Sequence, residues 1–172
     1  MSFPDDLLEQ AGHLAGVDAR RPKQVNLRRS VSASYYALFH LLTSSASSLF
    51  ASDAELKARI NRGFNHGDMK KVSLLIANGK WPKSIMLPTM ASSVNPDMDK
   101  LKTIANAFVE LQQARHAADY DLNRVYTREE AAGAIKTAQK AFEFWEIIKK
   151  TDYARLYLAC FLLYNRWNDE PR

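Results

Sequence analysis

The segment from residue 112 to residue 122, QQARHAADYDL, carries four side chains whose types and spacing are suited to chemistry. Arg115 and Asp119 are four residues apart, as are His116 and Tyr120, so each pair shares one face if the segment is helical. Arginine binds anions through a planar fork of donors, and histidine transfers protons near neutral pH. These four residues form the first candidate catalytic group.

A second polar stripe lies within residues 22–50, where polar side chains recur at steps of three and four residues. If the two helices pack side by side, the stripes meet and form a polar cluster in a groove between them, with His40 as a further candidate for catalysis. A network of this kind can also serve only to fix how two helices align. The stripe consists of Arg29, Ser32, Tyr36 and His40.

The apolar residues that precede Arg115 predict that the charged pair faces inward. They recur at helical spacing, and the continuation of their stripe passes through Arg115, Asp119 and Leu122. An isolated buried charge is costly, so the two charged side chains are expected to pair with each other. The apolar positions are Met98, Leu101, Ile104, Ala105, Phe108 and Leu111.

The motif FNHGDMKK contains a third candidate group. His66 stands near an expected helix start and is followed by Lys70 and Lys71, a combination that can bind phosphate at the amide end of a helix. The alternative is that His66 is only a turn residue. The four histidines show no metal-ligand spacing, and the sequence predicts neither a metal site nor a cofactor.

Few glycines and prolines interrupt this chain, and alternating strand patterns are absent, so the sequence predicts an all-α protein. The pattern indicates an up-and-down helical bundle of long antiparallel helices with short accessory helices and a C-terminal helix. We expect a single domain over residues 1–172, with a core of about 22–150 and an extension over 151–172. The expected helices cover roughly 4–16, 22–50, 52–62, 68–77, 96–122 and 127–150, and a C-terminal helix capped by Asp152 either follows or continues the last of these.

Two helix starts carry capping boxes, Ser52 with Glu55 and Thr127 with Glu130. Residues 79–95 hold Gly79, Pro82 and Pro88 and predict an irregular segment. A segment of that length is either a plain crossover connection or a lid or binding loop.

Composition limits the classes of protein that remain. The net charge of +5 weakly favours anionic partners, or serves only solubility. A single cysteine, Cys160, excludes an internal disulfide and a multi-cysteine metal site. The longest apolar run, residues 157–164, is too short to span a bilayer, and no signal peptide is recognisable. We therefore expect a cytoplasmic protein without a membrane partner.

Three segments in order along the chain resemble one branch of the HEPN superfamily of small prokaryotic α-helical proteins. They are RRSVSASYYALFHLL (28–42), FNHGDMKKV (64–72) and QQARHAADYDL (112–122), which include the YYAxFH and RxxADY patterns of that branch. The resemblance covers most of residues 22–150. It implies a helical bundle that forms a homodimer and, in many members, a ribonuclease of toxin–antitoxin, phage-defence or RNA-processing systems.

The resemblance also assigns roles to residues. The hallmark of these ribonucleases is an arginine, an adjacent polar residue and a histidine some five residues on. Here Arg115 and His116 match the first two positions and Tyr120 holds the place of the histidine. Metal-independent RNA cleavage needs a base, an acid and a cation that stabilises the transition state. A tyrosine ordinarily titrates near pH ~10 and is a poor base at neutral pH, so His116 or His40 would have to replace it.

Two functions therefore follow. The first is an RNA-directed, metal-independent ribonuclease with a rearranged site. The second is a non-catalytic interaction module that binds RNA without cleavage or binds a partner protein such as a nucleotidyltransferase-type antitoxin. The residues expected to contact nucleic acid are Arg29, Tyr36, His66, Lys70 and Lys71.

The C-terminal segment has more apolar surface than one side of a bundle needs, which predicts a homodimer contact. The competing possibility is that this helix folds back and closes its own bundle. The residues concerned are Tyr153, Leu156, Tyr157, Cys160, Phe161, Leu163, Tyr164 and Trp167.

Overall fold

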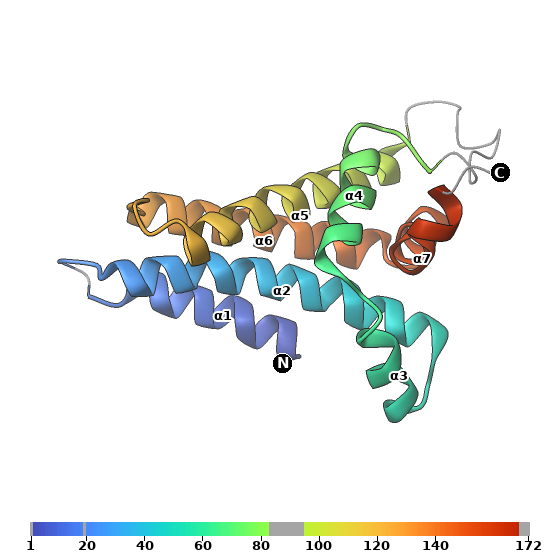
Figure 1. Ribbon diagram of the computed structural model, residues 1–172, viewed down its shortest axis with the longest axis horizontal. Helices are drawn as coiled ribbons and strands as arrows, with labels where there is room; N and C mark the ends of the chain where they lie inside the picture. The colour runs from blue at the N-terminus through green and yellow to red at the C-terminus, as the bar shows by residue number, and fades with distance from the viewer. Residues whose placement is uncertain (1, 19, 83–94, 169–172) are drawn as a thin grey trace. The chain divides into compact units, whose positions relative to one another are not determined.

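A computed structural model describes residues 2–18, 20–82 and 95–168, with side chains through residue 164. This part of the chain is built from helices and contains no strand, which confirms the predicted all-α class (Figure 1). Most of the expected irregular segment, residues 83–94, lies outside the described residues. The helices are α1 (Phe3–Gly16), α2 (Gln24–Phe50), α3 (Ala54–Asn61), α4 (His66–Ala77), α5 (Pro96–Tyr120), α6 (Arg128–Ile148) and α7 (Asp152–Asn168).

The helix starts follow local capping chemistry. The box predicted for α6 is present: the Thr127 amide donates to Glu130 Oε2 at 2.8 Å, and the Glu130 amide donates to Thr127 Oγ1 at 3.1 Å. The box predicted for α3 is wrong, because Asp53 rather than Ser52 is the N-cap, and its carboxylate accepts from the Leu56 amide at 2.9 Å. A carboxylate one residue further along reaches the free amides of the first turn.

Several of the other helix ends lie two residues from the sequence expectations. Helix α2 begins at Gln24, beyond Pro22, and α5 ends at Tyr120. Helix α4 begins at His66, because the Asn65 side chain caps it by accepting from the Asp68 amide at 2.9 Å. Helices α6 and α7 are separate, which settles the question that the sequence left open. The cap predicted at Asp152 is wrong, because Asp152 lies in the first turn of α7 and Thr151 Oγ1 accepts from the Ala154 amide at 3.3 Å.

The chain divides into two compact units. The first comprises Met1–Leu41 and Ala107–Glu143, and the second comprises Leu42–Asn106 and Phe144–Arg172. The first unit therefore contains α1, most of α2, the end of α5 and most of α6. Its buried cluster comprises Ala15, Leu27, Val31, Ala118, Tyr126 and Ala131.

The apolar stripe predicted for α5 is buried over its middle part, but its predicted continuation to Leu122 is wrong. Leu101, Phe108 and the other members of the α5 stripe from position 101 to position 111 have almost no exposed surface. Leu122, by contrast, is 85% exposed, because the helix ends at Tyr120 and the stripe cannot continue past it. On α2, Val25 in the first turn and Leu49 in the last turn are also exposed.

In the second unit, α7 buries its apolar face within its own unit. It packs against α4, where Ser73 Oγ and Tyr157 Oη are 2.7 Å apart. Tyr157, Cys160 and Phe161 are at most 3% exposed. These three residues of the predicted dimer surface are therefore internal, whereas Leu163 is 37% exposed and Tyr153, Leu156 and Tyr164 are partly exposed. Trp167 lies outside the described side chains.

Candidate ribonucleolytic site

Four side chains from α2 and α5 form one connected polar network in the first unit. Arg115 Nη2 donates to Tyr36 Oη at 2.7 Å, and Ser32 Oγ donates to Asp119 Oδ1 at 2.6 Å. Arg115 Nε and Asp119 Oδ2 are 2.7 Å apart, an ion pair without the alignment of a linear hydrogen bond. The two polar stripes therefore meet, and the predicted pairing of Arg115 with Asp119 is present.

The surroundings of Arg115 hold its guanidinium in place and keep it charged. Its Cζ atom lies 5.3 Å from the ring centroid of Tyr36 and 5.5 Å from that of Tyr120. Burial alone would lower the pKa of Arg115, but the neighbouring Tyr36 and Asp119 outweigh that effect and the pKa is raised. The side chain is 22% exposed, so solvent still reaches part of this cation.

His116 and Tyr120 extend this cluster toward solvent. Both side chains are exposed, and their ring centroids are 5.0 Å apart. Tyr120 therefore has Arg115 on one side and His116 on another, at the place where the family motif expects a histidine. Because the His116 ring is exposed, a ligand that binds Arg115 from solvent can also reach it.

His40 lies on the other side of Tyr36 and in a more apolar setting. Its ring centroid is 6.4 Å from that of Tyr36, 5.2 Å from that of Phe39 and 5.0 Å from that of Phe3. Burial lowers its pKa, so the imidazole is neutral near pH 7. Only Tyr36 links it to Arg115 among these contacts.

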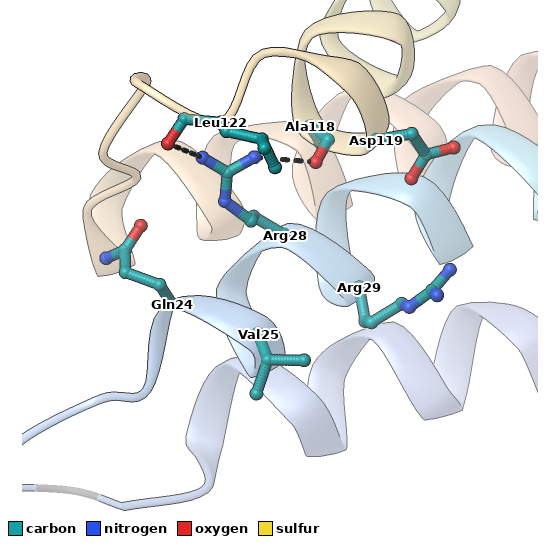
Figure 2. A pocket seen from close by; sticks show the side chains of 7 residues that line it. All are labelled: Gln24, Val25, Arg28, Arg29, Ala118, Asp119 and Leu122. Atoms are coloured by element: carbon teal, nitrogen blue, oxygen red, sulfur yellow. Dashed lines mark hydrogen bonds between the residues drawn. The ribbon is translucent and has the colours of Figure 1, made fainter.

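Arg29 is an exposed cation that makes no hydrogen bond or ion pair with the residues that the structure describes. It lines two hollows of the first unit. One, of about 520 Å³, also includes Asp119 and Leu122, and the other, of about 440 Å³, includes Tyr36 and His40. Figure 2 shows the Arg29 side chain extending separately from Arg28, with no dashed line to a neighbour.

Arg28 holds the end of α5 through contacts that the sequence pattern did not indicate. Its guanidinium donates to the carbonyl groups of Ala118 at 2.8 Å and Leu122 at 3.3 Å (Figure 2). It also donates to the carbonyl group of Arg124. These carbonyls belong to the end of α5 and the turn that follows, where a cation is favourable. Arg28 thereby fastens the segment that carries Arg115 and Tyr120, and no local spacing rule in the sequence indicated this contact.

The third predicted group does not lie in this cluster. His66, Lys70 and Lys71 belong to α4 in the second unit. The amide end of α4 is already capped by Asn65, whose Oδ1 accepts from the Asp68 amide at 2.9 Å, and the Asp68 carboxylate pairs with Lys71 at 3.2 Å. His66 is exposed at the first position of the helix.

Within residues 2–18, 20–82 and 95–168, no group of three or more histidine, cysteine, aspartate or glutamate side chains gathers in a way that could hold a metal ion. No helix in the same ranges is long and apolar enough to cross a membrane.

The comparison with protein families gives one match, a HEPN domain over residues 72–148. This range includes Arg115, His116 and Tyr120, whereas the YYALFH segment of α2 lies outside it. Comparison with curated proteins and with solved structures gives no match. The helical architecture and the arginine-containing motif of α5 agree with this match, and residues 72–148 are identified as a HEPN domain.

Proposed function

We propose that this chain is an RNA-directed HEPN protein that cleaves RNA without a metal ion, with Arg115 as the phosphate-binding group. The supporting observation is how Arg115 is held. Of the five N–H donors of a guanidinium, one binds Tyr36 and one faces Asp119, which leaves three without a partner among the described residues. A fixed cation with unused donors suits a phosphate, whose oxygens accept such hydrogen bonds in pairs.

The proposed reaction is attack of an RNA 2′-oxygen on the adjacent phosphorus. A base takes the 2′ proton, the bond from phosphorus to the 5′-oxygen breaks, and an acid protonates that oxygen, which leaves a 2′,3′-cyclic phosphate. Arg115 stabilises the charge that develops on the phosphate oxygens. We assign the base to His116, because its ring is exposed beside Tyr120, whereas His40 lies among aromatic rings.

A second function, a non-catalytic interaction module, is favoured by two features of the same site. Tyr120 holds the place of the motif histidine. The Asp119 carboxylate lies 2.7 Å from Arg115 Nε and offsets the positive charge of the guanidinium. Such a module would bind RNA without cleavage or bind a partner protein, such as a nucleotidyltransferase-type antitoxin.

Incubation of the purified protein with a mixed RNA pool in EDTA is expected to give cleavage that Arg115→Ala abolishes. Arg115→Lys keeps a cation opposite Asp119 and should fold normally, yet it is expected to lose most activity because it lacks the planar fork. RNA retention that falls with salt, but without cleavage, would support the non-catalytic module. Absence of both cleavage and retention would overturn RNA as the ligand.

HEPN domains commonly dimerise, and we propose a homodimer for this chain. Because Tyr157, Cys160 and Phe161 of α7 are buried, we place the contact instead at the more exposed side chains of Val25, Leu122 and Val125, in the unit that contains Arg115. Light scattering coupled to size exclusion at low micromolar protein is expected to give twice 19.5 kDa. Leu122→Asp should yield the monomer, whereas Leu56→Asp, at an exposed leucine of α3, should not. A wild-type mass near 19.5 kDa would contradict the dimer.

A further inference from the structure

A groove between α1 and α2 has no role in the reaction described above. It encloses about 440 Å³, within the ordinary range for a small-ligand site. Phe3, Leu7 and Leu14 of α1 make one side apolar. The α2 side is polar and is formed by Arg29, Ser32, Tyr36 and His40.

Aromatic rings gather at one end of this groove. Phe3 is 60% exposed and stands edge-on to His40, with ring centroids 5.0 Å apart. Tyr36 and His40 are nearly parallel, at 29° and 6.4 Å. An exposed phenyl ring beside two further planar rings provides flat surfaces on which another planar ring can stack.

The other features of the groove suit a ligand that is both planar and anionic. Arg29 lies on its wall without an ion-pair partner among the described residues. Tyr36 connects the groove to the phosphate-binding group, since its hydroxyl accepts from Arg115 at 2.7 Å. Gln10 adds an exposed amide without a described partner, which can donate to and accept from the edge of a ring.

We propose that this groove binds one nucleobase of single-stranded RNA by stacking on Phe3, with the adjoining phosphate held by Arg29. The inference rests on the proposed RNA-directed function and names the form of RNA that the site takes. Base stacking on aromatic side chains tolerates any base, because every base has a flat face. A base inside a duplex is already stacked and cannot enter, so the proposal requires a single strand. Burial keeps His40 neutral near pH 7, so it adds no charge to the surface around the base.

The test measures binding of fluorescein-labelled single strands by anisotropy. The strands are 2′-O-methylated, so they cannot be cleaved through the 2′-oxygen, and one version has bases whereas a second of equal length is abasic. Phe3→Ala is expected to weaken binding of the first strand by roughly tenfold and to leave the abasic strand unaffected. Phe50→Ala, a matched change at a phenylalanine of α2 that is 48% exposed, is expected to alter neither. Arg29→Ala should weaken the binding of both strands. It should also reduce the slope of the logarithm of the binding constant against the logarithm of the salt concentration by about 0.7 for each phosphate that the variant no longer binds.

Three outcomes would each overturn the inference while leaving the proposed function intact. One is binding by Phe3→Ala equal to that of Phe50→Ala, with both still dependent on Arg115. Another is equal affinity of the wild-type protein for the base-containing and the abasic strand. Unchanged affinity for the base-containing strand after it is paired into a duplex would have the same meaning. If the wild-type protein binds neither strand, the RNA-directed function itself fails, and the groove proposal fails with it.

Discussion

Replacement of Asp119 by alanine is expected to lower the free energy of unfolding by about 2–3 kcal/mol, between the value for an exposed ion pair and that for a fully buried one. The substitution leaves the Arg115 guanidinium without the carboxylate at 2.7 Å and removes the acceptor of the Ser32 hydroxyl. Arg115 and Asp119 are 22% and 17% exposed, so water replaces the missing partner only in part. Urea denaturation followed by circular dichroism measures the change.

Two further variants separate the charge from the hydrogen bond. Asp119→Asn keeps an oxygen that can accept from Ser32 and should lose less than Asp119→Ala. Asp152→Ala removes an ion pair with Arg155 in which the two side chains are 96% and 55% exposed, and it is expected to change stability by less than about 0.5 kcal/mol. An equally small effect for Asp119→Ala would show that the Arg115 pair behaves as a surface pair and that it is not what holds the arginine in place.

Replacement of His116 by alanine is expected to slow RNA cleavage at least about 100-fold, the loss typical for removal of a general base. RNA affinity should remain near the wild-type value, because the cation that binds phosphate is Arg115. His40→Ala is expected to have the opposite profile, with weaker binding of base-containing strands and a smaller effect on the cleavage step. The measurements are single-turnover cleavage at saturating protein and anisotropy with non-cleavable strands.

The comparison of these two histidines decides which one transfers the proton. If His40→Ala loses the cleavage rate while His116→Ala retains it, the assignment of the base is wrong and His40 takes that role. If neither variant slows a measurable wild-type reaction, neither histidine is the base. His13→Ala, a change at an exposed histidine of α1, is the matched control and should behave as the wild-type protein.

The local features of this protein were determined by its sequence. The helices, the capping box of Thr127 and Glu130, and the pairing of Arg115 with Asp119 all depend on residues at most four positions apart. At such separations the geometry of a helix fixes which side chains meet. For the same reason, the family motif of α5 is recognisable from the order of its residues alone.

The tertiary structure decided which faces are covered, since periodicity shows only that residues share a face and not what lies against it. Tyr157 and Phe161 of α7 are buried, whereas Leu122 lies past the end of α5 and is exposed. Arg28 reaches carbonyl groups some 90 positions away in sequence, and Phe3 is brought against His40. Such contacts depend on how entire helices pack, and that packing is determined by many side chains that are distant in sequence. A short spacing rule cannot predict it.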